Sequence, residues 1–517
     1  MRRGLGRLLV GLTLLALLGC TQVRNPATGE LQYTSLTPED EKKLGREENP
    51  KALAQFGGRY EDATLSAYVE KVGNRVKNAS ELADQPFTFT VLDSDVVNAF
   101  ALPGGYVNVT RGLLALTNNE AELAGVLGHE IGHVTARHTA QRYDQAQVGQ
   151  LGATAAQLAG LLLGGYLGGS QGAQLGGQAA GQIGSLGAQA YVQGYSREQE
   201  FQADQLGIRY LGAAGYDPGA MATFLATLQA EDAYQQRTAG GQGEDSPLGD
   251  WFRSHPRTPE RVARAVEAVN LETPGARETG RPALLVAIDG MLYGEDPAQG
   301  VIRGRSFQHP QLRIGFEAPP GFKLQNSPRQ VAGADGKGRY MVFDMAEGAG
   351  GDLLGYLQGS WISKQHLQDL QSVDLGGREA AVGFGRVTLG SRPAQAMFAA
   401  VRGQGSAVYR FIYADTGGFD RSDLADFEQS LRTFRTLSAA EIADLKPMRL
   451  RVVPVGPGDT LDSFARRMQV PADTDPRALF VLLNGLDRGR EMRPGDQVKI
   501  ITMDSRPLTA RADASRG

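Results

Sequence analysis

The pentapeptide His129-Glu130-Ile131-Gly132-His133 offers the clearest chemistry in this chain of 517 residues. Residues four apart lie on one face of a helix, so both imidazoles can bind the same Zn²⁺. Glu130 projects beside them, where its carboxylate can take a proton from water. Because only six histidines occur in the chain, chance alone rarely produces this pattern. The motif predicts a zinc hydrolase; the competing interpretation is a structural helix that carries two histidines.

The residues around the motif predict a helix. Asn119, followed three residues later by Glu122, resembles a capping box at a helix start. The apolar residues that follow recur at helical spacing: Leu123, Val126, Leu127, Ile131 and Val134. Both histidines border this stripe, so we expect the metal at the edge of a buried helix face.

A third metal ligand must come from outside the pentapeptide. A longer zinc motif would need Gly at position 136 and His at position 139, where this chain has Ala136 and Thr139. His138 lies about 140° around the helix from the second histidine, which favours a supporting or surface role. Glu200 is the better candidate. It shares a helix face with Asp204, so one carboxylate could bind zinc while the other orients an imidazole.

Four ordered motifs make residues 25 to 270 resemble the HtpX-like and BepA-like peptidases, a family of zinc metallopeptidases with a gluzincin fold. The matching stretches are residues 98–106, residues 119–124 before the zinc motif, Arg197 with Glu200 and Ala203-Asp204, and Ser254-His255-Pro256 with Arg261. The resemblance implies a mainly helical catalytic domain with a small sheet.

The same resemblance assigns roles to individual residues. It implies one Zn²⁺ per chain, held by His129, His133 and Glu200. Glu130 becomes the general base that takes a proton from water and passes it to the leaving amine. Asp204 is expected behind the ligands, where it would orient one of the imidazoles.

The resemblance implies that the strand around Asn98, Ala99 and Phe100 borders the substrate cleft. An extended peptide could pair with an exposed strand edge near Ala99–Leu102. His255 and Arg261 are candidates for stabilising the oxyanion formed during peptide hydrolysis. Resemblance to BepA-like members also allows His255 to occupy the open zinc position in a latent state. A purely structural role is the third interpretation of His255.

The amino terminus has the pattern of a bacterial lipoprotein signal. Three arginines precede an apolar run over residues 8–18 that is too short to cross a bilayer, and Cys20 follows in a lipobox-like sequence. Cys20 is the only cysteine, so no disulfide can form within the chain. We expect residues 1–19 to be removed and Cys20 to carry a lipid at the head of a linker over residues 20–29. Thr21 then favours the outer membrane, by resemblance to other lipoproteins; a secreted form without lipid is the alternative.

Composition gives no argument for a nucleic-acid partner. Loss of the three arginines takes the formal net charge from −4 to about −7, and no basic run stands out. Length and changes in composition instead predict an α+β chain of several domains.

The zinc metallopeptidase domain is expected over residues 30–268. Within it, residues 145–196 are rich in Gly, Ala and Gln, which predicts either a mobile flap over the active site or a buried helical hairpin. Short alternating segments over residues 282–437 predict a two-layer α+β domain with an antiparallel sheet. This central domain slightly resembles PsbP/Mog1-like domains. It shows no catalytic constellation, so its role is unknown.

Residues 449–502 resemble a LysM module. The residues that carry the resemblance are Gly458-Asp459-Thr460-Leu461, Phe464-Ala465, Asn484, Pro494-Gly495-Asp496 and Val498-Lys499-Ile500. The pattern predicts a strand, two short helices and a strand, with Thr460 as the first helix cap. The resemblance implies binding to peptidoglycan, although the long spacer between the helices puts the glycan site in doubt. The alternative is a packing module that binds no sugar.

Two functions are compatible with these features. The first is a lipid-anchored zinc endopeptidase of the bacterial periplasm that degrades misfolded or stalled envelope proteins. The second is a chaperone-like or peptidoglycan-tethering protein with a latent zinc site. The intact pair of histidines with Glu130 favours the enzyme, because a scaffold has no physical need for a base at that position.

Overall fold

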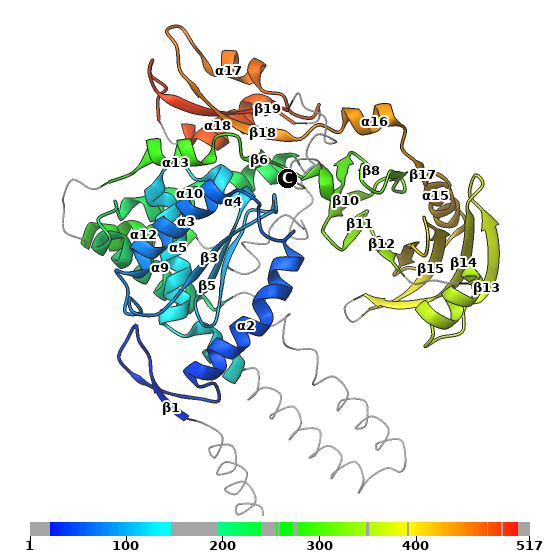
Figure 1. Cartoon of the computed structure of the whole chain (residues 1–517), viewed down its shortest axis with the longest axis horizontal. Coiled ribbons are helices and arrows are strands. Elements are labelled where there is room, and N and C mark those ends of the chain that lie inside the picture. The colour runs from blue at the N-terminus through cyan, green and yellow to red at the C-terminus, as the bar shows by residue number, and fades with distance from the viewer. Residues whose placement is uncertain are drawn as a thin grey trace, which may run out of the picture.

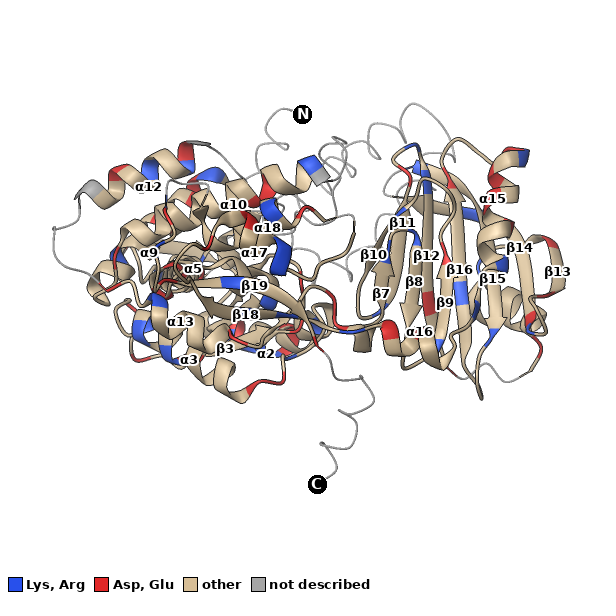
Figure 2. Cartoon of the chain, turned by 90° about the horizontal axis from the view of Figure 1, so that it is seen from above, with Lys and Arg blue, Asp and Glu red and all other residues tan. Residues whose placement is uncertain are grey.

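The computed structural model describes residues 21–145, 195–238, 255, 259–271, 278–347, 351–389, 392–472, 474–486 and 490–504. The expected signal peptide, Cys20 and nearly all of segment 145–196 therefore lie outside the described residues. The described chain is α+β and forms a helical unit around the zinc motif and a second unit rich in strands (Figure 1). Seen from above, the units lie side by side, and residues of both charge signs are interspersed over them (Figure 2).

Helices surround a small sheet in the first unit. The helices are α2 (Pro38–Gln55), α3 (Ala63–Lys77), α4 (Arg111–Leu116), α5 (Glu120–Thr135), α9 (Arg197–Ala213), α10 (Gly219–Thr238), α12 (Pro259–Leu271) and α13 (Arg281–Ile288). A hairpin of β1 (Thr21–Arg24) and β2 (Leu31–Thr34) precedes them. In the described part of the chain, no helix combines the length and apolar character of a membrane span.

The zinc helix α5 is more deeply buried than its apolar stripe suggests. All of its residues except Val134 are buried, including those on the face opposite the stripe. On that face Gly128 lies against Gly207 of α9, where a Cβ on Gly128 would be 3.3 Å from the Gly207 Cα and carbonyl oxygen. Two glycines at the crossing let the helix axes approach closely. This contact brings α9, and with it Glu200, alongside the two histidines.

The start of α5 is capped differently from the expected capping box. The Asn119 side chain accepts a hydrogen bond from the Glu122 backbone N–H at 2.8 Å, as an N-cap does. However, the Glu122 carboxylate accepts from the Asn118 backbone N–H at 2.7 Å, and not from Asn119. It also accepts from the Thr223 hydroxyl at 2.9 Å, because α10 packs against this end of α5. The reciprocal half of the predicted box is therefore replaced by a tertiary contact.

Three strands form the small sheet beside α5. β3 (Thr88–Leu92) pairs in parallel with β5 (Tyr106–Thr110), and β4 (Ala99–Leu102) pairs antiparallel with the other side of β5. Among the described residues, β4 pairs with β5 alone, so it is an edge strand. An edge strand next to α5 has the position that a peptide-binding edge requires.

The second unit is built on two antiparallel sheets. The first has the order β17 (Arg435–Thr436), β9 (Ile314–Glu317), β8 (Ser306–His309), β7 (Val301–Arg303). The second has the order β10 (Lys323–Asn326), β11 (Gln330–Ala334), β12 (Arg339–Ala346), β16 (Val408–Asp415), β15 (Arg392–Arg402), β14 (Glu379–Leu389), β13 (Gln368–Asp374). Helix α15 (Arg421–Arg432) contributes Phe427 to the aromatic core shared with Phe316, Phe343 and Phe411. A short helix, α14 (Leu353–Gly355), and the turn that follows it pack on a separate core of the large sheet.

The carboxyl end follows α16 (Ala439–Asp444) and has the expected order of a strand, two helices and a strand. These elements are β18 (Met448–Pro454), α17 (Leu461–Arg467), α18 (Pro476–Asn484) and β19 (Gln497–Met503). β18 also pairs with β6 (Leu292–Tyr293), and the apolar side chains of this module continue the core of the helical unit. The Lys499 ammonium is buried and donates to the carbonyl oxygens of Ala115 and Thr117, each at 2.8 Å. The module is therefore packed onto the catalytic unit, and its LysM identity and glycan binding stay predictions.

The segment that follows α12 packs with the helical unit and not with the second unit. Helix α13 and β6, which we expected at the beginning of the central domain, contribute to the core of the helical unit. The aromatic core of the second unit begins only after β6, with Phe307 on β8. The linkage between the two units thus lies between β6 and β8.

Candidate metal centre

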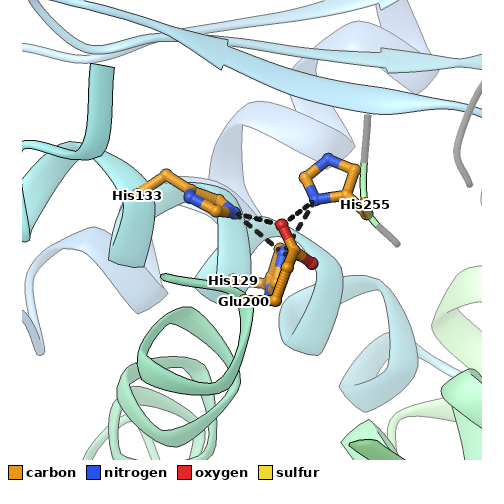
Figure 3. Close-up of side chains that lie close together, drawn as sticks. All are labelled: His129, His133, Glu200 and His255. Carbon is orange, nitrogen blue, oxygen red and sulfur yellow. Dashed lines mark hydrogen bonds and ion pairs between the residues drawn. The ribbon is translucent and has the colours of Figure 1, made fainter. Parts of the chain in front are cut away.

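Four side chains converge on one point between α5 and α9 (Figure 3). His129 and His133 come from α5, Glu200 comes from the first turns of α9, and His255 completes the group. All four are buried, and their donor atoms lie within 4.8 Å of one another. The structure thus places the predicted third ligand beside the two histidines.

The separations between these atoms match a tetrahedral zinc site. The two Nε2 atoms of His129 and His133 are 3.0 Å apart, and they lie 3.6 and 3.5 Å from the nearer Glu200 oxygens. His255 Nδ1 lies 3.3 Å from His129 Nε2 and 2.9 Å from Glu200 Oε1. Zinc bonds of about 2.0–2.1 Å in tetrahedral geometry require donor atoms about 3.3 Å apart. Nitrogen and carboxylate donors are also the ligands that zinc prefers, so the residues present fit the metal.

His255 closes this donor set. Its Nδ1 occupies the fourth corner, and its Nε2 lies 3.6 Å from Glu130 Oε1. Structural zinc sites have four protein donors, whereas catalytic sites keep one position open for water and substrate. This arrangement is the one that the latent interpretation of His255 expects, and that interpretation stays a prediction.

Glu130 lies between the donor set and the edge strand. It is fully buried, and within the described residues neither of its oxygens has a hydrogen bond of regular geometry. Burial raises the pKa of Glu130, while His255, His129 and the backbone amide of Ala101 oppose the shift. A carboxylate whose pKa moves toward neutrality is better matched to accept and return a proton near pH 7.

A charged network lies behind the ligands. Asp204 Oδ1 is 2.9 Å from His129 Nδ1, which leaves Nε2 directed at the other donors. Arg261 donates two hydrogen bonds to Asp204, both 2.8 Å, and its Nη1 lies 2.7 Å from Glu200 Oε2. The guanidinium therefore contacts the two carboxylates that hold the site together. This geometry differs from the expected oxyanion role of Arg261 and corresponds to a positioning residue.

The same network shifts the pKa values of the ligands in different directions. Burial and the neighbouring charges of His129 and His138 hold the pKa of His133 well below its usual value, whereas Asp204 and Glu200 outweigh burial and raise the pKa of His129. Burial opposes ionisation of Glu200, but the charges of His255 and Arg261 lower its pKa. Burial likewise opposes ionisation of Asp204, yet Arg261 and His129 lower its pKa to about 2. Neutral imidazole and ionised carboxylate are the forms that bind zinc.

Two residues support His133, and only the first of them could be expected from the sequence. His138 is buried, with its Nδ1 2.8 Å from His133 Nδ1 and its Nε2 2.9 Å from the Gln202 side-chain oxygen. This contact is the supporting one of the two roles expected for His138. The Tyr195 ring stacks on the His133 ring, with centroids 3.9 Å apart, and nothing in the sequence pattern indicated Tyr195. Both contacts depend on how residues beyond α5 pack around its end.

The strand expected to border the substrate lies beside the donor set, and Ala101 is the residue of this strand that meets the base. Asn98 and Ala99 are buried, and the ring of Phe100 packs 5.1 Å from that of Phe56. Ala101, one residue further along β4, has the backbone amide that interacts with Glu130. The edge strand thus approaches the donor set at Ala101.

A buried His–His–Glu donor set with a carboxylate on the same helix is the combination of side chains that a zinc hydrolase site requires. Residues 63–269 match the family model described as Peptidase family M48. This segment is therefore similar to the metallopeptidases of that family.

Several proteases are similar to up to about half of this chain. The Beta-barrel assembly-enhancing protease of Yersinia pestis is 33% identical over 244 residues, which is 46% of this chain and 45% of that protein. The Metalloprotease LoiP of Escherichia coli is 29% identical over 199 residues, 38% of this chain and 66% of that protein. The Mitochondrial metalloendopeptidase OMA1 of Schizosaccharomyces pombe is 26% identical over 262 residues, 49% of this chain and 68% of that protein.

These similarities cover the relatives only in part. The chain spans less than half the length of the beta-barrel assembly-enhancing proteases it matches. Among solved structures, the PsbP protein of Synechocystis covers 25% of this chain with 11% identity and a TM-score of 0.19, which is too low to assign the central domain.

Proposed function

We propose that the protein is a zinc-dependent endopeptidase of the bacterial periplasm that cleaves misfolded or stalled envelope proteins. The observation that carries the proposal is the buried donor set of His129, His133 and Glu200 with Glu130 beside it. A structural site needs the donors alone. A carboxylate that has no strong partner of its own and lies next to the donors is what hydrolysis requires.

Each residue of the site has a separate role in the proposed hydrolysis. When bound there, Zn²⁺ supplies the Lewis acidity that lowers the pKa of a water molecule and polarises a peptide carbonyl. Glu130 accepts the proton of the attacking water and then gives it to the leaving amine nitrogen. Asp204 and Arg261 hold His129 and Glu200 in position. Strand β4 offers its free edge to the backbone of an extended substrate, so affinity does not depend on one sequence.

The substrate class follows from this mode of binding and from the named relatives. An edge strand can pair only with a chain that is locally extended and unfolded. Five relatives are named for beta-barrel assembly enhancement, and this supports unfolded outer-membrane proteins as substrates. The closed donor set favours a site that stays latent until His255 moves away. The alternative function is a chaperone-like or tethering protein. The same observation supports it, because a site with four protein donors leaves no position for a substrate.

Removal of the metal tests the proposal. Zinc-loaded protein is expected to cleave an unfolded protein such as reduced casein, and chelation should abolish the cleavage until zinc, but not magnesium, is returned. The melting temperature should fall on chelation, because a ligand present at a thousand times its Kd stabilises the folded state by about 4 kcal/mol. Bound zinc without cleavage of any unfolded substrate would favour the binding protein.

We also propose that Cys20 carries the lipid that anchors the protein to the outer membrane. The support is the apolar run over residues 8–18 followed by the only cysteine of the chain. The variant Cys20→Ser, expressed in a Gram-negative host, should move from the membrane fraction to the soluble periplasmic fraction. Retention of Cys20→Ser in the outer-membrane fraction would contradict the anchor.

A further inference from the structure

A cavity opens beside the metal centre, between the end of α5 and the edge strand β4. Its lining includes His133 from the donor set and Ala101 from β4, so it is continuous with the place where a substrate would be cleaved. The opposite wall is formed by the β1–β2 hairpin and α2, which contribute Arg24 and Lys42. Both elements precede residue 63, where the match to the peptidase family begins.

The hairpin is fastened to the zinc helix. The Asn25 side chain donates to the Ala136 carbonyl oxygen at 2.9 Å, and the Ala27 backbone N–H donates to the Thr135 carbonyl at 3.2 Å. These bonds satisfy carbonyl groups at the carboxyl end of α5, which no further turn of the helix could reach. The hairpin that forms this wall of the cavity is thus bonded directly to the end of the helix that carries His133.

Positive charge predominates in the lining. Arg24, Lys42 and Arg137 carry three cations, and Glu41 is the only acidic residue among the described residues that line the cavity. Glu41 is already engaged, with its Oε2 3.1 Å from both Nε and Nη2 of Arg137. Two positive charges therefore remain without a matching carboxylate in the cavity wall.

Arg137 supplies the most specific observation. Its residue is only 4% exposed, yet within the described part of the chain its Nη1 has no hydrogen-bond partner. The other nitrogens bond Glu41 and the Leu36 carbonyl. Arg137 also has φ of 55°, a left-handed conformation in which a bulky side chain is strained. A buried guanidinium donor without an acceptor is costly, and a carboxylate is the acceptor that fits it best.

We propose that this cavity is a substrate subsite that accepts a carboxylate close to the scissile peptide bond. The carboxylate is either an Asp or Glu side chain or the free carboxyl terminus of the substrate. A peptide paired with β4 sends alternate side chains toward the cavity, where exposed Lys42 and Arg24 meet the acid and the buried Arg137 guanidinium adds positive charge from within the wall. This inference rests on the proposed peptidase function and names its preferred substrates.

Matched peptides test the subsite in the zinc-loaded full chain. One series of internally quenched peptides carries a single Glu or Gln at each position around the cleavage site, and a second compares a free with an amidated carboxyl terminus. We expect kcat/KM to be about tenfold higher for the acidic member of the responsive pair. The series that responds identifies the source of the carboxylate.

Charge variants test whether the cavity causes the preference for acidic peptides. Lys42→Glu should remove the preference for the acidic peptide, and Arg137→Lys should reduce it while retaining the positive charge. Lys43→Glu makes the same charge change one residue along α2, outside the cavity lining, and should leave the preference intact. Equal behaviour of Lys42→Glu and Lys43→Glu, or equal cleavage of acidic and neutral peptides, would overturn the subsite.

Binding without catalysis separates this inference from the proposed function. Zinc-loaded Glu130→Gln is titrated with the same peptides, and fluorescence anisotropy reports their Kd. Tighter binding of the acidic peptide that Lys42→Glu abolishes would support the subsite even if wild type cleaved no peptide. Cleavage by wild type with no difference in Kd between the peptides would support the peptidase and contradict the subsite.

Discussion

The variant Glu130→Gln is expected to bind zinc as wild type does and to lose nearly all proteolytic activity. Glutamine keeps the size of the side chain but cannot accept the proton of the attacking water. Loss of a general base typically lowers kcat by about 10²–10⁴-fold. The measurement compares zinc content and cleavage of an unfolded substrate for the two proteins under identical conditions.

A control separates loss of the base from loss of the fold. Glu198→Gln removes a carboxylate from the exposed first turn of α9 and should leave kcat unchanged. The melting temperature of Glu130→Gln should not fall below that of wild type, because the variant removes a buried carboxyl group whose pKa is raised by burial. Equal activity of Glu130→Gln and wild type would exclude Glu130 as the base.

Replacement of His255 by Ala should increase proteolysis. In the structure, His255 Nδ1 occupies the fourth corner of the donor set, 2.9 Å from Glu200 Oε1. If the imidazole leaves that position in only 1–10% of the molecules, its removal raises kcat/KM by about 10–100-fold. Initial rates with a quenched peptide, measured at saturating zinc, report the change.

The three interpretations of His255 predict different outcomes of this experiment. An oxyanion role would make His255→Ala lose kcat while KM stays the same. A purely structural role would lower the melting temperature without an increase in rate. Exposed His366 in the central domain provides the matched control, because His366→Ala removes an imidazole far from the metal centre along the chain. A rise in kcat/KM for His255→Ala alone would identify the blocking histidine.

Much of the metal centre could be predicted from the sequence, because its parts obey local geometry. A helix brings residues four apart onto one face, so His129 and His133 were recognisable as a pair, as were Glu200 and Asp204. The apolar spacing around the pair located α5, and alternating segments located strands such as β12 and β16. Local periodicity also gave the order of the elements in the carboxyl-terminal module.

Tertiary structure alone decided how those parts meet. Close contact at Gly128 and Gly207 sets the approach of α9 to α5, and no local pattern encodes that distance. The engagement of Arg261 with Asp204 and Glu200 depends on where α12 packs.

The sequence by itself determined which chemistry the chain can perform, because residue types and helical spacing select a metal and a base. The folded chain decided what surrounds that chemistry: His255 in the fourth position, the module docked through Lys499, and the basic cavity beside His133. Each of these features joins residues far apart in the chain, and such contacts arise from the packing of whole elements, which spacing along the sequence does not record.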